Sequence, residues 1–383
     1  MAIGDITGEI ASLEWDADRG WYPNIIHVSD DVYAISYEGP DYDGWLKTVS
    51  ISDDGVTISV IDSFEFDETY GIYPTIIHVL GDVYAIAYSG PSDDGWLKTV
   101  GIQSDGTITG TIDSFEFDAV FGLYPDITHV TGDIYAIPYD GPDYDGWLKT
   151  VGIQSDGTIT GTIDSFEFDT VNGRSPDIIN IAGDIYAIAY EGPDGDGWLK
   201  TVGILSNGTI TGTIDSFEFD TVDGIDPNII NIAGDIYAIA YEGPGGDGLL
   251  KTVGIQSDGT ITGMIDSFVF VSGWWSPMPH IIGVVDDVYA IAYMGNFDHC
   301  WLQTVEIQSD GTITGMIDSF DVDSSLGTVT PWLIRISSGV YSVTYGGPGD
   351  DGWLKTIGIE TPSEAAHHRF IGFTGGFPHR SIH

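Results

Sequence analysis

Short runs in which apolar and polar residues alternate cover most of the chain. In the first complete unit they lie at 23–28, 31–37, 44–51 and 55–67, separated by polar or glycine-containing segments. β-Branched and aromatic residues dominate these runs, and a period of two is typical of half-buried strands. Ser-Asp-Gly or a similar turn often stands between the third and fourth runs, where glycine supplies the positive φ of a tight hairpin. The pattern predicts units of four antiparallel strands, here named A to D.

The four-stranded unit repeats along the chain. A strand-B tyrosine recurs every 51 or 52 residues, at Tyr33, Tyr84, Tyr135, Tyr186, Tyr237, Tyr289 and Tyr341. Units of this size bury their apolar faces against their neighbours, so seven copies predict one stacked array. Four antiparallel strands per unit, arranged in a ring, form a β-propeller. A β-solenoid usually repeats in fewer residues, and separate domains would need linkers that the chain lacks.

The two ends of the array complement each other. Residues 4–16 align with strand D, as at 106–118, whereas the last copy has strands A to C at 331–336, 340–345 and 352–359 but no D. We therefore expect an all-β, seven-bladed β-propeller over residues 1–360, in which 4–16 completes the last blade. The tail at 361–383 leaves the repeat. A disordered end, a segment foreign to the native protein and a basic strap across the acidic ring all remain open for it.

The repeated units read like DVYAIAY-GP-DDGWLKT-DGTI-IDSFEFD. Over residues 3–359 the chain resembles the repeat arrays of archaeal and bacterial surface-type β-propellers. That resemblance implies the propeller fold and an extracellular or cell-surface setting, but no particular chemistry. The first residues show neither a basic segment nor an apolar core of the kind found in secretory signals.

The charge balance limits the possible partners. The sequence has 11 Lys and Arg against 59 Asp and Glu, for a net charge of −48. Such a surface repels nucleic acid and anionic membranes, so we expect neither as a partner. It suits cations, cationic partners or neutral sugars. Cys300 is the sole cysteine, which excludes a disulfide framework and a cysteine-based zinc site.

The loops of one face vary much more than those of the other. In a propeller the B–C and D–A loops share one face, here called the top, and the A–B and C–D turns share the bottom. The bottom turns are nearly constant along the chain, whereas the top loops differ from copy to copy. Because binding residues concentrate on loops held by a rigid scaffold, the top face is the candidate site.

Aromatic and imidazole side chains gather in the strand-A and loop segments of this face. Flat rings beside carboxylates and amides suit a sugar, whose C–H faces stack while its hydroxyls hydrogen-bond. The sixth copy departs most from the others, so we expect a cleft there; packing between blades is the alternative role for the rings. The predicted ligand-binding residues are Tyr22, Tyr73, Tyr124, Trp274, Trp275, His280, Phe297, His299 and Trp332.

The B–C loops repeat an Asp-x-Asp-Gly motif. Acidic loops with a turn glycine can wrap Ca²⁺, which takes several oxygen ligands, but the remaining ligands of an EF-hand are missing here. A simple β-turn is the alternative. The candidate calcium ligands are Asp41, Asp43, Asp143, Asp145, Asp194 and Asp196; no other cofactor is indicated.

Three further patterns have structural interpretations. His27, His78 and His129 occupy one strand-A position in successive blades, too far apart for one metal ion, and we expect hydrogen-bonded structural roles. The acidic residues of IDSFEFD keep an outer edge strand charged, and the recurring strand-C lysine is expected to pair with them across the sheet. The residues that directly follow the strand-A prolines are mostly polar, and we expect them to form a ring near the top mouth of the channel. In that ring Asp126 and Asp177 are neighbours.

These observations favour a non-enzymatic binding or surface-display propeller that recognises carbohydrate or a protein partner through its top loops, with Ca²⁺ as an open addition. A polysaccharide-active hydrolase or lyase at the channel mouth is the first alternative, since paired carboxylates serve as acid and base in glycoside cleavage. Near-identical copies argue against it, because catalysis needs one blade to differ in a specific role. A structural subunit of a surface layer or filament is the second alternative.

Overall fold

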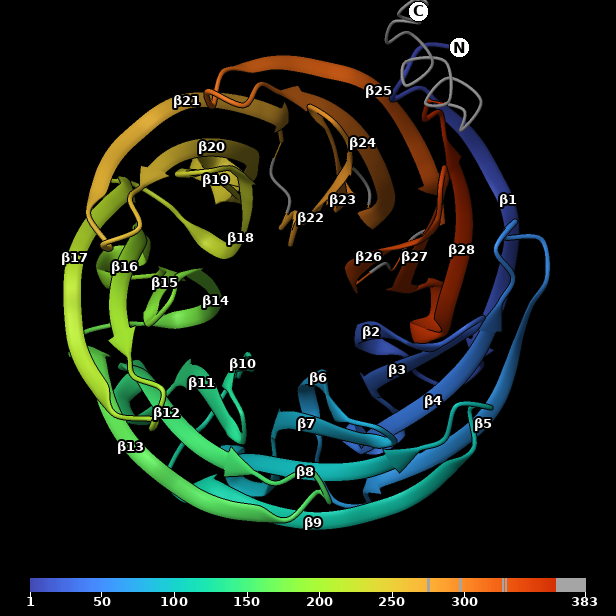
Figure 1. The fold of residues 1–383 in the computed structure, drawn as a ribbon. Coiled ribbons are helices and arrows are strands. Elements are labelled where there is room, and N and C mark those ends of the chain that lie inside the picture. Colours follow the sequence, from blue (N-terminus) through green and yellow to red (C-terminus); the bar gives the residue numbers. More distant parts are fainter. Residues whose placement is uncertain (274–275, 296–297, 326, 328, 363–383) are drawn as a thin grey trace, which may run out of the picture.

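The computed structural model describes residues 1–362 except 274–275, 296–297, 326 and 328. The chain forms seven four-stranded antiparallel sheets, arranged as blades around a central channel (Figure 1). This confirms the predicted seven-bladed β-propeller. In the described part of the chain no helix is long and apolar enough to cross a membrane. The predicted tail lies almost wholly outside the described residues.

The strands follow the same order from channel to rim in every blade. Strand A is β2 (Trp21–Ser29), β6 (Ile72–Leu80), β10 (Thr128–Thr131), β14 (Arg174–Ala182), β18 (Ile225–Ala233), β22 (His280–Val285) and β26 (Val329–Ser337). Strand B is β3 (Val32–Glu38), β7 (Val83–Ser89), β11 (Ile134–Asp140), β15 (Ile185–Glu191), β19 (Ile236–Gly243), β23 (Val288–Gly295) and β27 (Val340–Gly346). Strand C is β4 (Gly44–Ile51), β8 (Gly95–Ile102), β12 (Gly146–Ile153), β16 (Gly197–Ile204), β20 (Asp247–Ile255), β24 (His299–Ile307) and β28 (Gly352–Ile359).

The outermost strand D is β5 (Ile58–Asp67), β9 (Ile108–Asp118), β13 (Ile159–Asp169), β17 (Ile210–Asp220), β21 (Ile261–Val271), β25 (Ile313–Asp323) and, for the seventh blade, β1 (Ile6–Asp16). Three-residue 3₁₀ turns occupy B–C loops at Pro40–Tyr42, Pro91–Asp93, Pro142–Tyr144, Pro193–Gly195, Pro244–Gly246 and Pro348–Asp350.

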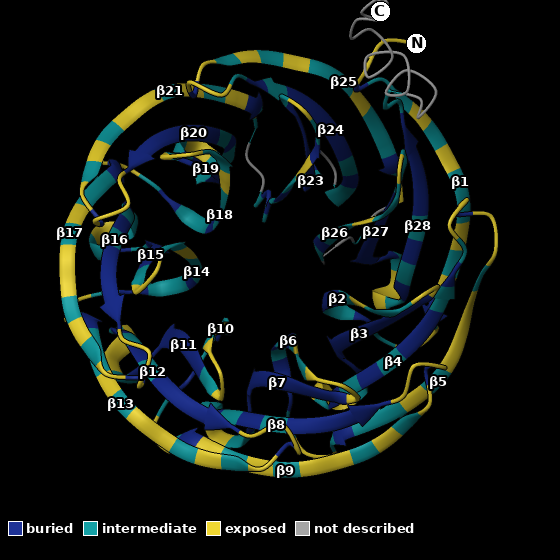
Figure 2. Cartoon of the chain, viewed as in Figure 1, coloured by how far each residue is buried: buried dark blue, intermediate teal, exposed yellow. Residues whose placement is uncertain are grey.

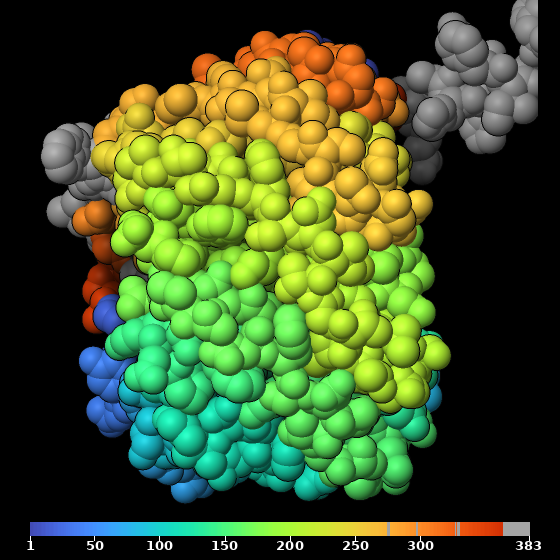
Figure 3. All heavy atoms as spheres, turned by 90° about the vertical axis from the view of Figure 1, so that its left-hand side faces the viewer, coloured from blue at the N-terminus to red at the C-terminus, as the bar shows by residue number. Residues whose placement is uncertain are grey.

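Burial follows the hydrophobic pattern of each strand. β7 is buried along its whole length, whereas β9 alternates between exposed and half-buried positions. Figure 2 shows the same contrast around the ring, with dark inner sheets and a banded outer rim. Each core cluster joins two consecutive blades: Tyr84 and Ile86 of blade two pack with Leu46 and Phe66 of blade one. Seen from the side, successive blades pack directly on one another (Figure 3).

The N-terminal strand closes the ring as predicted. β1 pairs antiparallel with β28, with Leu13 opposite Leu354. The Gly4 amide donates to the Glu360 carbonyl at 2.9 Å, and the Thr304 hydroxyl donates to the Gly4 carbonyl at 2.7 Å. In the other blades the same threonine bonds the glycine of the next C–D turn, as Thr252 does with Gly311 at 2.6 Å. Gly4, at φ +91°, therefore takes the place of the missing turn glycine.

A lysine, an aspartate and a tyrosine join neighbouring blades near the top of the ring. Lys98 of blade two lies 2.8 Å from the Asp67 carboxylate of blade one, and the Tyr88 hydroxyl donates to the same oxygen at 2.8 Å. The Lys98 and Asp67 side chains are 13% and 12% exposed. The prediction that strand-C lysines pair within their own sheet is wrong for the last aspartate of the motif. That aspartate belongs to the preceding blade.

We call this arrangement the interblade triad. It recurs at six blade junctions, with the ion pairs Lys47–Asp16, Lys98–Asp67, Lys149–Asp118, Lys200–Asp169, Lys251–Asp220 and Lys355–Asp323. Burial alone would raise the pKa of Asp118, but hydrogen bonds from Lys149 and Tyr139 outweigh it and leave that pKa below its usual value. The triad therefore holds the aspartate ionised at the blade junction.

The first aspartate of IDSFEFD also joins blades. Its carboxylate accepts a hydrogen bond from the first strand-D amide of the next blade, as Asp62 does from Ile108 at 2.9 Å. This contact was not predicted from the sequence, which indicated a charged edge strand and pairing with the strand-C lysine. The bonded aspartates are Asp62, Asp113, Asp164, Asp215, Asp266 and Asp318.

The junction between blades five and six lacks the triad. Val271 stands where the aspartate would be and Gln303 where the lysine would be, while Tyr293 keeps the tyrosine position. The Tyr293 hydroxyl donates to Gln303 Oε1 at 3.4 Å, and the buried Gln303 Nε2 has no hydrogen-bond partner in the described part of the chain. A cavity of about 210 Å³ lies beside these side chains.

We expect the double variant Val271→Asp/Gln303→Lys to restore a seventh triad. Each single change buries an unpaired charge and should lower the free energy of unfolding by about 2–3 kcal/mol. Together the two charges should recover part of this loss, with a coupling energy of about 2 kcal/mol in a double-mutant cycle measured by denaturant unfolding. Additive single effects would contradict the assignment of Val271 and Gln303 to the triad positions. Lys149→Met, which removes an existing triad, is the matched destabilising control.

Candidate functional site

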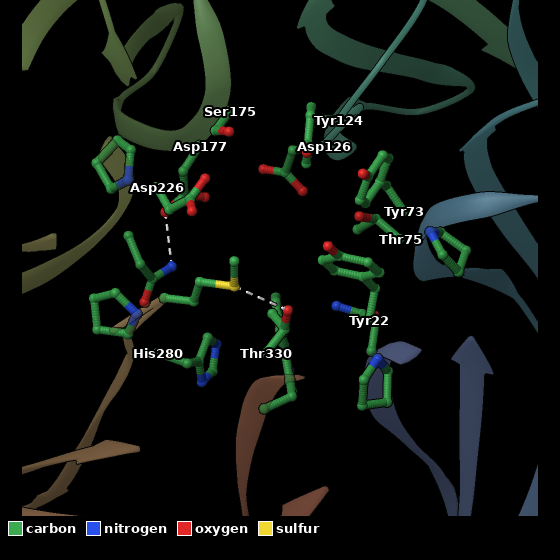
Figure 4. Close-up of a pocket in the computed structure, with 18 of the residues that line it drawn as sticks. Tyr22, Tyr73, Thr75, Tyr124, Asp126, Ser175, Asp177, Asp226, His280 and Thr330 are labelled. Carbon is green, nitrogen blue, oxygen red and sulfur yellow. Dashed lines mark hydrogen bonds between the residues drawn. The ribbon is translucent and has the colours of Figure 1, made fainter. Parts of the chain in front are cut away.

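Seven three-residue segments, one from each blade, line a cavity of about 190 Å³ at the top mouth of the channel (Figure 4). Each segment has proline in the middle, and we call them the proline triplets. They are Tyr22-Pro23-Asn24, Tyr73-Pro74-Thr75, Tyr124-Pro125-Asp126, Ser175-Pro176-Asp177, Asp226-Pro227-Asn228, Met278-Pro279-His280 and Thr330-Pro331-Trp332. The predicted polar ring after the proline is therefore confirmed at the channel mouth.

A distortion of the innermost strand directs each triplet toward the channel. In β6 the pairing with β7 shifts between Ile72 and Thr75, which places Tyr73 and Pro74 in a β-bulge. Bulges re-aim side chains and occur often beside binding sites. The residue before the proline has positive φ in all seven blades, between 38° for Met278 and 51° for Tyr73. For a non-glycine residue such a conformation costs about 1–3 kcal/mol and persists only where the surroundings enforce it.

Glycine in the D–A loop allows the approach to this bulge. A Cβ on Gly71 would lie 2.5 Å from the Gly44 Cα, so the loop can cross strand C only without side chains there. The Gly71 amide donates to the Tyr42 carbonyl at 2.8 Å, which ties the D–A loop to the B–C loop. These contacts fix the position of the chain just before the triplet begins at Tyr73.

The third residue of most triplets also bonds the next blade. Asn24 Oδ1 accepts from the Ile76 amide at 3.2 Å, and Asn228 Oδ1 accepts from the Ile281 amide at 3.0 Å. His280 accepts through Nδ1 from the Leu333 amide at 3.2 Å. Burial lowers the pKa of His280 to about 3, so its ring is neutral at physiological pH. It stacks on Trp332 with ring centroids 4.0 Å apart.

Asp126 and Asp177 form a close carboxyl pair in this ring. The Asp126 carboxylate accepts from the Ile178 amide at 3.2 Å and from its neighbour Ile127 at 2.8 Å. Asp177 accepts from the Ile229 amide at 2.7 Å and from the Asn228 side chain at 2.8 Å. Burial raises the pKa of Asp126, and burial together with Asp126 raises that of Asp177 well above its usual value.

Tyrosines form the opposite wall of the cavity. Tyr73 stacks on Tyr124 with centroids 3.9 Å apart and meets the edge of Tyr22 at 4.5 Å. Burial raises the pKa of all three hydroxyls, which therefore stay protonated. In Figure 4 the tyrosines lie on one side, Asp177 and Asp226 on the other, and Asp126 near Tyr124. Burial raises the pKa of Asp226 as well.

Two arginines of the top loops lie between aromatic rings and acids. The Arg19 guanidinium lies 3.8 Å from the Trp21 ring centre and 4.1 Å from that of Tyr42, and it pairs with the buried Glu38. Burial raises the pKa of Glu38 to about 7, although Arg19 acts in the opposite direction. Arg174 lies 4.1 Å from the Tyr144 ring and 3.9 Å from Glu191. The top face therefore binds guanidinium groups of its own chain in cages of rings and carboxylates.

Of the predicted ligand-binding residues, five line the mouth cavity, and these are Tyr22, Tyr73, Tyr124, His280 and Trp332. His299 lies at the start of β24, where its ring is 3.4 Å from Asp321, and it is not among the lining residues. Trp274, Trp275 and Phe297 fall outside the described residues, so the predicted cleft at blade six stays a prediction.

The first residue of three triplets was not predicted to belong to the site. These residues are Ser175, Asp226 and Thr330. The signal was available, because aligning the copies on the strand-A proline places them in register with Tyr22, Tyr73 and Tyr124. Because the side chains at this position differ in type, their shared place in the repeat is easy to overlook.

The acidic B–C loops adopt tight turns with left-handed residues. Asp41, Asp143 and Asp194 have φ between 60° and 63°, one step after the proline of each 3₁₀ turn. Within the described ranges no group of three or more His, Cys, Asp or Glu side chains is placed to hold a metal ion. The geometry thus adds no support to the calcium prediction for these loops, which include Asp43, Asp145 and Asp196.

The strand-A histidines have the expected structural role. Each Nε2 bonds a carbonyl of the bottom A–B turn: His27 with Asp30 at 2.8 Å, and His78 and His129 with Gly81 and Gly132 at 2.9 Å. Asn180 and Asn231 make the equivalent bonds in blades four and five. These residues therefore stabilise the bottom turns.

No protein-family model matches the sequence, and no match was found among curated proteins. Solved structures share the fold at low identity. The periplasmic gluconolactonase PpgL of Pseudomonas aeruginosa has a TM-score of 0.60 and 13% identity, covering 80% of this chain and 86% of that one. The WD40 domain of Toxoplasma gondii coronin has a TM-score of 0.64 and 11% identity, covering 100% and 98%.

A third similar structure is BBS1N, solved in complex with ARL6DN, with a TM-score of 0.56 and 9% identity over 95% of this chain and 99% of that one. Identities this low show the propeller architecture alone, and that architecture carries both enzymes and binding proteins. The resemblance to surface-type propellers stays a prediction.

We expect Asp177→Asn to stabilise the protein increasingly as the pH rises from about 4 to 8. A carboxyl whose pKa is higher in the folded than in the unfolded state makes folding less favourable as pH rises through that interval. Asparagine removes this penalty and can still accept from Ile229, as Asn228 accepts from Ile281 in blade five. Thermal midpoints across this pH series measure the effect.

Asp118→Asn is the matched control for this series. Its carboxylate has a lowered pKa, so the variant should be less stable at neutral pH, and the difference should shrink as acid protonates the native carboxylate. A uniform loss of stability in Asp177→Asn at every pH would contradict the raised pKa.

Proposed function

We propose that this protein is a non-enzymatic binding propeller whose protein partner inserts a short segment into the mouth cavity. The observation that carries this proposal is the set of seven proline triplets. Each has positive φ before its proline, five of them lie at a shift in the strand pairing, and together they line one cavity with differing side chains. Strain of this kind is retained at sites where function repays it. Variation concentrated on one face of a constant scaffold suits recognition.

The size of the cavity supports a protein segment over an extended sugar. Sites for drug-sized ligands measure about 300–1,000 Å³, whereas the mouth holds about 190 Å³. One long side chain from a partner matches that volume, while an oligosaccharide would lie mostly outside it. Propellers of similar fold include BBS1N, whose structure was solved with a protein partner.

A hydrolase remains the second candidate, because Asp126 and Asp177 form a carboxyl pair with raised pKa at the cavity wall. PpgL, a gluconolactonase, has the same fold. Against this candidate, both carboxylates already accept backbone amides of the following blade, a role that Asn24 and Asn228 fill elsewhere in the ring. Turnover of lactones or polysaccharides that Asp177→Asn abolishes would favour the hydrolase.

We expect the full chain to select peptides from a random display library, and Tyr73→Ala to weaken the selected peptides by about tenfold or more. The substitution removes the central ring of the tyrosine wall. Leu80→Ala, an exposed residue at the bottom of the same blade, should leave binding unchanged. A glycan array run in parallel distinguishes carbohydrate recognition. Peptide binding indifferent to Tyr73→Ala would move the site away from the mouth.

A further inference from the structure

We infer that the group entering the mouth cavity is a cationic side chain, the ammonium of a lysine or the guanidinium of an arginine. This inference rests on the proposed function and names the chemistry of the partner. It follows from how charge, aromatic rings and space are distributed among the lining residues.

The ionisable side chains that line the cavity are almost all acidic. Asp126, Asp177 and Asp226 line the cavity, and none of its described lining residues is Lys or Arg. His280 provides no compensation, because its Nδ1 accepts a backbone amide and its ring is neutral. The hydrogen bonds to the carboxyl groups come from neutral partners, as from the Asn228 side chain to Asp177 at 2.8 Å. The lining therefore holds three carboxyl groups and no cation to balance them when they ionise, and burial raises the pKa of each.

The tyrosine wall offers ring faces to a cation. A cation with an apolar arm can lie against the faces of Tyr73 and Tyr124 while its charged end reaches the carboxylates on the other side (Figure 4). A side chain between the two walls would therefore contact both.

The chain itself binds two of its own cations in this way on the same face. Arg19 lies between Trp21 and Tyr42 and pairs with Glu38, and Arg174 covers Tyr144 beside Glu191. Those two cages hold a cation of this protein. The mouth offers the same combination of rings and carboxylates, with no described arginine or lysine in its lining.

A bare divalent ion matches the mouth less well. Ca²⁺ needs six to eight oxygens at about 2.3–2.6 Å, and in the described part of the chain no three acidic, histidine or cysteine side chains converge closely enough for a metal. Seven prolines and the tyrosine rings make much of the lining apolar. An organic cation uses both the apolar and the acidic surface.

The test uses four synthetic peptides, acetyl-Gly-Gly-X-Gly-Gly-amide, in which X is Lys, Arg, Gln or norleucine. Titration calorimetry or ligand-observed NMR with the full chain at low salt measures their affinities. We expect the Lys and Arg peptides to bind at least about tenfold more tightly than the Gln and norleucine peptides. Their affinity should rise with pH from about 5 to 8, because the carboxyls must ionise to pair with the ligand.

Because the whole protein is strongly acidic, the control must separate the mouth from general attraction. Asp226→Asn should weaken the Lys peptide about tenfold. Asp235→Asn removes an equal charge from an exposed turn at the bottom of the same blade and should have little effect. Equal losses in the two variants would show non-specific attraction and overturn the inference.

The outcomes also separate this inference from the proposed function. If norleucine or Gln peptides bind as tightly as Lys peptides and Tyr73→Ala abolishes that binding, the mouth is a peptide site but the cation is wrong. If none of the four peptides binds while library-selected peptides without Lys or Arg do, the inference again falls alone. If neither the four peptides nor the library yields a binder sensitive to Tyr73→Ala, both proposals fall.

Discussion

Contacts between consecutive blades hold this molecule together, because a single four-stranded sheet of this length can bury its apolar faces only against its neighbours. Each core cluster joins residues of two blades, as Leu46 and Phe66 do with Ile86. Polar contacts reinforce each junction at different heights. Near the bottom the Thr48 hydroxyl donates to the Gly106 carbonyl. At the rim the Asp62 carboxylate accepts from the Ile108 amide, and near the top lies the interblade triad. The seventh blade needs β1 because without it blade six would face an incomplete sheet.

That scaffold explains how the mouth can carry seven strained positions. The bulge at the blade-two triplet is held by Gly71 of the D–A loop, by the strand pairing that resumes at Thr75 and by the Asn24 side chain of the preceding blade. Because these restraints come from backbone and from the third residue of the triplet, the first residue is free to vary. Tyr, Ser, Asp, Met and Thr all occupy it at similar φ. The same backbone conformation can therefore present different side chains to the cavity.

Much of the fold could be predicted from the sequence. The period, the Asp-Gly turns and the complementary ends gave the number of blades and the closing strand, since these depend on local patterns and simple topology. The interblade triad could not be read from one copy, because its lysine and aspartate lie in different copies. A comparison within the chain could have revealed it, since Val271 and Gln303 replace both partners at one junction. The polar ring after the proline was predicted. The positive φ before the proline was not, because that position ordinarily avoids it.

The triad-free junction between blades five and six has a mechanical consequence. A closed ring under thermal strain opens first at its weakest contact, and neighbouring elements then fray from there. Here that seam lies away from the chain termini, beside a cavity and a glutamine with an unmet donor. We therefore expect the ring to open between blades five and six, where the chain is continuous, and not between its two ends, which the β1–β28 pairing holds together.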